Sequence, residues 1–115
     1  MSESTSESRD RTTIAPEVLI TIARHAVLEL EGVAQLARVS GGVNRLFRRA
    51  GAYGVRIEVK DDIVSAEIYL VVTAGMNLRE VSREVQQSVT RSMEDIVGLE
   101  VEHININIED VTFDQ

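Results

Sequence analysis

Residues 55–72, VRIEVKDDIVSAEIYLVV, contain the pattern that determines the fold. Val55, Ile57 and Val59 alternate with charged residues, and a second alternating run, from 64 to 72, follows Asp61-Asp62. Alternation of apolar and polar residues is typical of a strand with one buried face, and two aspartates between such runs favour a tight turn. The stretch therefore predicts a β-hairpin.

An amphipathic helix is predicted before the hairpin. Pro16 fits its first turn, where a missing N–H costs nothing, and Gly32 is placed to end it. The apolar residues recur at helical spacing. This stripe consists of Ile14, Val18, Leu19, Ile22, Ala23, Ala26, Val27 and Leu30.

A second amphipathic helix is predicted after the hairpin. Asn77 is expected to cap it with Glu80 in a capping box, and Gly98 is expected to end it. The apolar stripe consists of Val81, Val85, Val89, Met93 and Ile96.

Further strands complete the predicted sheet. Residues 33–39 suit a short strand, residues 43–50 one or two helical turns, and the alternating isoleucines from Ile104 to Ile108 a last strand. Because the last two strands flank a helix, we expect a right-handed β-α-β crossover. The predicted fold class is α+β: a two-layer α/β sandwich, with a small mixed sheet and two helices packed on one face.

Length and composition are typical of one small domain. The chain has 115 residues, no Cys and two His, which excludes disulfides and the usual Cys/His zinc modules. Residues 1–13 are rich in Ser, Thr and Glu, so we expect a disordered tail followed by a single domain over residues 14–113. No apolar run approaches the roughly 20 residues that span a bilayer, and no signal peptide is evident, which favours a cytoplasmic protein.

Charge is distributed unevenly along the chain. Residues 31–56 carry five arginines and one glutamate, a net charge of +4, whereas residues 77–115 carry three arginines and nine acids, a net charge of −6. This pattern suits self-association or a charged partner better than general nucleic-acid binding, which usually needs a basic domain.

No catalytic, cofactor-binding or metal-binding residues are predicted. The chain has no Cys nucleophile and no G-x-S-x-G motif, and His25 and His103 lie on separate elements, where structural roles are favoured. The acidic pairs Asp61-Asp62, Glu94-Asp95 and Glu109-Asp110 are interpreted as turn formers or solvated acids, because neighbouring side chains point apart.

The open face of the sheet and the basic segment are the candidate interaction sites. The side chains expected on that face are Arg56, Glu58, Ser65, Glu67, Tyr69, His103, Asn105 and Asn107. For the arginines beside Phe47, a solvated loop and a contact with a partner or membrane surface both stay open. The candidate interaction residues are Arg45, Phe47, Arg48, Arg49, Tyr69, Asn105 and Asn107.

Gly51-Ala52-Tyr53-Gly54 matches the G-x-x-G string of RNA-binding KH domains. In those domains the loop joins two helices and clamps the nucleic-acid backbone. Here it runs into the strand at Val55 and has no Lys or Arg between its glycines, which favours an ordinary loop with no role in binding. A KH-like RNA-binding module is kept as the alternative function.

Several short motifs follow one another in a characteristic order across residues 13–113. They are Thr13-Ile-Ala-Pro-Glu-Val-Leu with Ile22-Ala23, Glu31-Gly-Val-Ala, the hairpin, Val81 through Gln86-Gln87-Ser-Val, Val97-Gly-Leu-Glu-Val and Ile104-Asn-Ile-Asn-Ile-Glu-Asp-Val. This ordered set resembles the alkaline shock protein family of bacterial envelope stress response proteins. One departure is Thr73-Ala74-Gly75, where the family often has E-Y-G and only the glycine is kept.

The resemblance implies a non-enzymatic cytoplasmic protein that supports cell-envelope homeostasis under stress. It implies self-association and a membrane-anchored protein partner, through which the protein would reach the membrane without a span of its own. No cofactor and no nucleic acid are expected.

Overall fold

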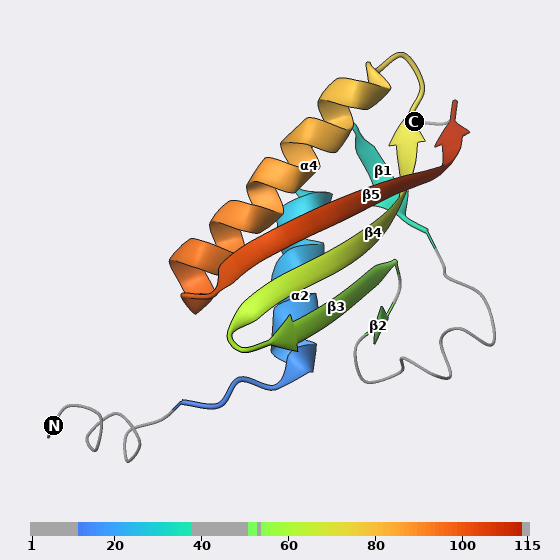
Figure 1. The fold of residues 1–115 in the computed structure, drawn as a ribbon. Coiled ribbons are helices and arrows are strands. Elements are labelled where there is room, and N and C mark those ends of the chain that lie inside the picture. The colour runs from blue at the N-terminus through green and yellow to red at the C-terminus, as the bar shows by residue number, and fades with distance from the viewer. Residues whose placement is uncertain (1–11, 38–50, 53, 114–115) are drawn as a thin grey trace, which may run out of the picture.

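Strand β4 (Ile63–Thr73) is the centre of a five-stranded sheet in the computed structural model, which describes residues 12–37, 51–52 and 54–113. The other elements, in chain order, are α2 (Pro16–Leu28), β1 (Val33–Leu36), β2 (Gly51–Ala52), β3 (Val55–Lys60), α4 (Leu78–Ser92), the π-helical turn η1 (Met93–Val97) and β5 (Glu100–Thr112). Figure 1 shows their arrangement.

Both edges of β4 are paired. On one edge β3 pairs antiparallel with the first half of β4, and β1 pairs antiparallel with the second half. These two strands meet at Tyr69, whose N–H donates to the Gly54 carbonyl and whose carbonyl accepts from Ala37 N–H, both at 2.8 Å. The other edge of β4 pairs in parallel with β5.

The predicted hairpin is confirmed. Lys60 pairs with Ile63 across a two-residue turn, in which Asp61 and Asp62 have φ of 54° and 65°. Positive φ at both central residues is the geometry of the type I′ turn that matches the twist of paired strands. The inward side chains of β4 are buried. They are Val64, Ala66, Ile68, Leu70 and Val72.

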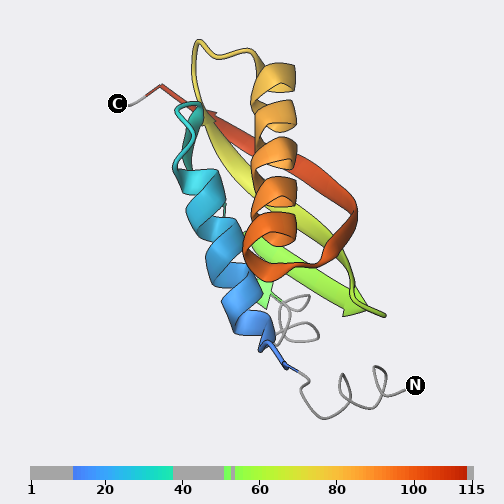
Figure 2. The same ribbon diagram turned by 90° about the vertical axis from the view of Figure 1, so that its left-hand side faces the viewer.

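Both helices pack on one face of the sheet, as Figures 1 and 2 show. Strand β4, helix α4 and the parallel strand β5 form the predicted crossover. The two-layer α+β fold class is therefore confirmed.

Helix α2 differs from its prediction in two ways. It begins with Pro16 at its first position, as expected, but ends at Leu28, before Gly32. Its buried face includes Ile20, whereas Val18 is 47% exposed, so assigning Val18 to the stripe was wrong. Val18 lies in the first turn of the helix, outside the set of residues that α2 buries against the sheet.

Gly32 has a packing role instead. A Cβ atom at this position would lie 2.6 Å from Val81 Cγ2 and 3.1 Å from Met76 Cε. Real Cβ atoms essentially never show contacts as short as the one to Val81, so the missing side chain lets the segment after α2 approach the first turns of α4.

Helix α4 begins as predicted. The Asn77 side chain accepts a hydrogen bond from Glu80 N–H at 3.0 Å, which satisfies one of the free donors of the first turn. Gly98, at φ 83°, ends the helical segment and donates to the Met93 carbonyl at 2.9 Å.

Ile96 is 67% exposed, so its assignment to the buried stripe was wrong. Val81, Val85, Val89 and Met93 are buried as expected. After Met93 the chain forms the π-helical turn η1, which has more residues per turn than an α-helix. The wider turn rotates the following residues, and Ile96 leaves the buried face.

Some predictions fall on residues that the structure does not describe. They are the tail at 1–13, apart from Thr12 and Thr13, the helical turns at 43–50 and the end of the first strand at 38–39. These predictions lie outside the described residues.

Replacing Val85 with Asp should unfold the protein. Val85 is fully buried in the middle of α4, and an unpaired buried carboxylate costs several kcal/mol, of the order of the whole stability of a small domain. A thermal melt followed by circular dichroism measures the effect. Gln87→Asp, which adds the same charge at an exposed position of α4, should melt near wild type. A normal melt of Val85→Asp would refute the assigned core.

Gly32→Ala should destabilise the fold through a steric clash with Val81, by about 1–3 kcal/mol, the usual cost of overpacking. Adding Val81→Ala should remove the clash, so the double variant should be more stable than the sum of the single effects predicts. Chemical denaturation measures each free energy of unfolding.

Gly75→Ala is the matched control for this cycle. Gly75 has φ 93°, and a Cβ atom added there would have no neighbour within 4 Å, so any cost of the substitution is backbone strain. Val81→Ala should not relieve that cost. If Val81→Ala changes the free-energy cost of Gly32→Ala and of Gly75→Ala equally, the contact of residue 32 with Val81 is unimportant.

Candidate functional site

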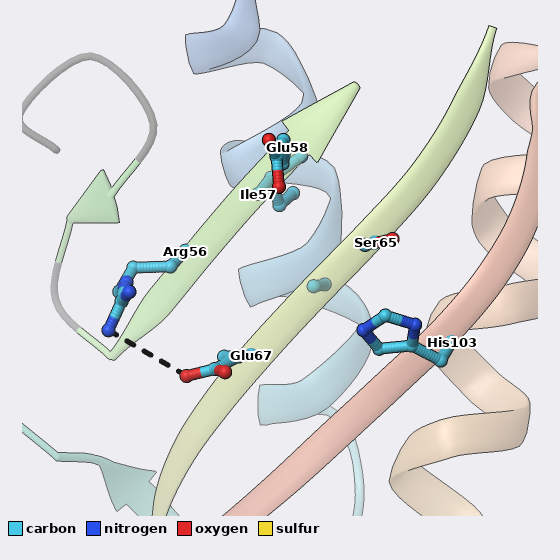
Figure 3. Close-up of a pocket in the computed structure, with 7 residues that line it drawn as sticks. Arg56, Ile57, Glu58, Ser65, Glu67 and His103 are labelled. Carbon is cyan, nitrogen blue, oxygen red and sulfur yellow. Dashed lines mark ion pairs between the residues drawn. The ribbon is translucent and has the colours of Figure 1, made fainter. Parts of the chain in front are cut away.

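The outer sheet face, defined as the side chains of β3, β4 and β5 that point away from α2 and α4, carries polar groups. A shallow hollow of about 180 Å³ lies on it. Its lining residues are Arg56, Ile57, Glu58, Ser65, Ala66, Glu67 and His103 (Figure 3). The structure thus brings together five of the side chains that strand alternation predicted for this face.

Arg56, Glu67 and Tyr69 form a polar cluster on the outer sheet face. Arg56 Nη1 donates to the Tyr69 hydroxyl at 3.1 Å, and the hydroxyl donates to Glu67 Oε1 at 2.6 Å. Arg56 Nη1 also lies 3.7 Å from the same Glu67 oxygen, an ion pair visible in Figure 3. Each group has a partner of complementary character, which fixes the half-buried Tyr69 ring on the sheet.

Local structure brings these three residues together. The hairpin register places Arg56 opposite Glu67, and residues two apart on one strand share a face, which brings Glu67 beside Tyr69. Strand alternation predicts Tyr69 on the interaction surface, but its link to Arg56 and Glu67 was missed. The two-residue turn could have predicted the pairing of Arg56 with Glu67.

The cluster raises the pKa of Tyr69 above its ordinary value of 10.0. The largest cause is the hydrogen bond to Glu67, which needs the phenol proton; burial and the negative charge of Glu67 act in the same direction. Arg56 opposes the shift. Tyr69 is therefore a hydrogen-bond donor to Glu67 at neutral pH.

Ser65 and His103 contribute donors and acceptors at the other side of the hollow. The Ser65 hydroxyl donates to Glu102 Oε1 at 3.3 Å, and the exposed His103 ring extends from β5 towards β4 (Figure 3). Within residues 12–37, 51–52 and 54–113, no three His, Cys, Asp or Glu side chains lie close enough to hold a metal ion. The arrangement offers a shallow, mixed-charge surface for hydrogen bonding.

The candidate interaction residues separate into two groups. Tyr69 lies opposite Asn107, and Glu67 opposite Asn105, in the parallel register of β4 and β5, so both asparagines adjoin the polar cluster. Asn105 is exposed and Asn107 half-buried. Arg45, Phe47, Arg48 and Arg49 lie outside the described residues.

His25 has the local role that the sequence favours. Its Nδ1 lies 3.5 Å from Glu29 Oε2, one helical turn along α2, and both side chains are largely exposed. His103, in contrast, lines the hollow and belongs to the candidate surface.

The G-x-x-G string belongs to a strand pairing. Gly51 pairs with Arg56 and Ala52 with Val55, so Gly51–Ala52 forms strand β2, and the interpretation of these two residues as a loop was wrong. In a KH domain this loop would join two helices. The first two residues of the motif that suggested RNA binding therefore pair with β3 in the sheet.

Comparison with known proteins identifies relatives along nearly the whole chain. The family profile of the alkaline shock proteins, described as having a cell envelope-related function, matches residues 4–113. The uncharacterized protein YqhY of Bacillus subtilis (strain 168) is 33% identical over 103 residues, which cover 88% of this chain and 76% of that protein. YloU of the same organism is 24% identical over 102 residues, with 85% of each chain covered.

Solved structures with a similar fold include the copper form of the MamM CTD. It matches with a TM-score of 0.53 at 12% identity, covering 86% of this chain and 89% of that one. A zinc form of a variant of the same domain has a TM-score of 0.52 at 15% identity. At this level of identity the likeness shows the fold alone. Among the helices in the described part of the chain, none is long and apolar enough to cross a membrane.

Tyr69 should titrate above pH 10.0, and Glu67→Gln should lower its pKa, because a neutral amide accepts the phenol hydrogen bond more weakly than the carboxylate and also lacks the negative charge that disfavours tyrosinate. Tyrosinate absorbance in a Tyr53→Phe background measures this, since the chain has two tyrosines. The protonated phenol stabilises the fold below pH 10.0, and this contribution should be lost as the pH rises through the folded-state pKa.

Glu58→Gln is the control for this titration. It removes the same charge from the same hollow, at a residue outside the Tyr69 hydrogen bonds. Its effect on the Tyr69 pKa should be the smaller one. Equal effects would show that general charge, and not the hydrogen bond, controls Tyr69.

Proposed function

Because the chain belongs to the alkaline shock protein family, whose function is cell envelope-related, we propose that it is a non-enzymatic stress response protein that supports cell-envelope homeostasis by association. In this proposal it acts in the cytoplasm, assembles with itself and binds a membrane-anchored partner. The observation that carries the proposal is the family match over residues 4–113.

The outer sheet face supports association as the mode of action. Both helices pack on the opposite face, so among the described residues no helix covers this side of the sheet (Figure 2). Asn105 and Asn107 each offer an amide donor and a carbonyl acceptor beside the Tyr69 cluster. An aromatic side chain held among polar groups is characteristic of protein–protein interfaces.

The charge distribution supports the same mode. The segment at 31–56, with a net charge of +4, and the region from residue 77 onward, with a net charge of −6, are complementary between two copies. Such complementarity speeds encounter and fixes orientation between subunits, and added salt weakens it.

Replacing Arg45, Arg48 and Arg49 with Glu should reduce both self-association and recovery with the membrane fraction, while leaving the circular dichroism spectrum unchanged. Sedimentation velocity across a salt series measures association, because screening acts over roughly 10 Å at 0.1 M salt. Asn105→Arg with Asn107→Arg should have the same effect by placing bulky charges on the outer sheet face.

Replacing Arg9 and Arg11 with Glu is the charge-reversal control. This variant reverses arginine charges in residues 1–13, which belong neither to the basic segment at 31–56 nor to the acidic region from residue 77 onward. It should sediment like wild type. If the arginine and asparagine variants associate as strongly as wild type at low and high salt, the proposed contact is wrong.

A further inference from the structure

One edge of β5 has no strand partner within the part of the chain that the structure describes. This strand has 13 residues, Glu100–Thr112, and it pairs with β4 on its other edge. An open strand edge presents backbone N–H and C=O groups that can pair with another extended chain.

A groove lies between this strand and α4. Its volume is about 280 Å³, and its lining residues are Leu78, Arg79, Ser82, Arg83, Gln86 and Ile108. The Gln86 amide donates to the Ile104 carbonyl at 3.0 Å, which ties the helix to the strand and closes the groove at that end. Figure 1 shows α4 and β5 lying alongside one another.

Arg79 and Arg83 give the groove its charge. They are four residues apart on α4, where like charges repel, and Arg79 lies in the first turn, where the helix dipole disfavours a cation. Within the described residues, neither arginine forms an ion pair. A bound anion would offset both the repulsion between the two arginines and the unfavourable interaction of Arg79 with the helix dipole.

The neighbouring acids do not neutralise these arginines. Glu80 and Glu84 follow them directly on α4, where successive residues point about 100° apart, and Glu80 lies three residues before Arg83. Within the described residues, however, neither glutamate forms an ion pair with either arginine. Neither glutamate lines the groove, and neither does Glu109 of β5. The exposed guanidinium groups are therefore available to a ligand.

The spacing of the two arginines matches an extended chain. Four residues of an α-helix advance about 6 Å along its axis, and two residues of a strand advance about 6.6 Å. Carboxylates at alternate positions of a strand added to β5 would therefore meet Arg79 and Arg83 in turn. Leu78, which is 41% exposed, and the half-buried Ile108 provide apolar contacts in the same groove.

We propose that the groove between α4 and β5 binds an extended acidic segment of a partner protein, which pairs with the free edge of β5 and places alternate carboxylates against Arg79 and Arg83. This mode of recognition is strand addition, in which backbone pairing gives affinity and side-chain contacts give specificity. The groove is separate from the outer sheet face, so the inference does not depend on the proposed association through that face.

A fluorescein-labelled peptide of alternating glutamate and valine tests the inference by fluorescence anisotropy with the full chain. The chain carries a net charge of −7, so it does not attract an acidic peptide in general, and binding reports a local basic site. Arg83→Glu should weaken binding about tenfold or more, the effect of losing one charged hydrogen bond. Arg91→Glu, the same charge change on α4 outside this groove, should bind like wild type.

A second peptide separates strand addition from simple charge attraction. It has the same composition, with the glutamates in one block and the valines in another, and it should bind at least about tenfold more weakly because only alternate carboxylates of a strand can face α4. The proposal is overturned if the alternating peptide does not bind wild type, if both peptides bind equally, or if Arg83→Glu and Arg91→Glu have equal effects. Circular dichroism of each variant confirms that the fold is retained, and none of these results bears on the outer sheet face.

Discussion

The pairing of β4 on both of its edges is the constraint on which the rest of the structure depends. Since side chains of a strand alternate between faces, fixing the register of β4 places Val64, Ala66 and Ile68 under the helices and Glu67 and Tyr69 on the outer sheet face. A slip of one residue would exchange the two sets and bury charged groups. The two-residue turn at Asp61 and Asp62 prevents this slip on the β3 side, and helix α4 returns β5 to the other side.

Features set by local sequence were predictable. Alternation identified the hairpin, and Asn77 and Gly98 marked the ends of the second helical segment, because capping and turns depend on a few neighbouring residues. Features that depend on distant contacts were not. The role of Gly32 becomes evident only when Val81 is placed against it, and the exposure of Ile96 only when Met93–Val97 is seen to form a π-helical turn.

The two candidate surfaces also differ in how far the sequence predicts them. Strand alternation placed Tyr69, Asn105 and Asn107 on one face without any coordinates, and the parallel register confirms that they are neighbours. The groove beside β5 was not predictable, although the helical spacing of Arg79 and Arg83 is visible in the sequence. That spacing acquires a meaning only when α4 is known to lie beside an open strand edge.

The acids of β5 restrict what can pair with its open edge. An antiparallel pair of β5 strands centred on Ile106 would set Glu102 of one copy opposite Asp110 of the other, and like charges directly opposite one another are destabilising. Charged residues on an edge strand are a common protection against unwanted pairing of identical strands. This repulsion disfavours a second copy of β5 as the occupant of the groove. It leaves room for a different segment whose carboxylates point towards α4, where Arg79 and Arg83 lie, and whose other side chains are uncharged. The outer sheet face and the edge of β5 thus present different chemistry, although one central strand positions both.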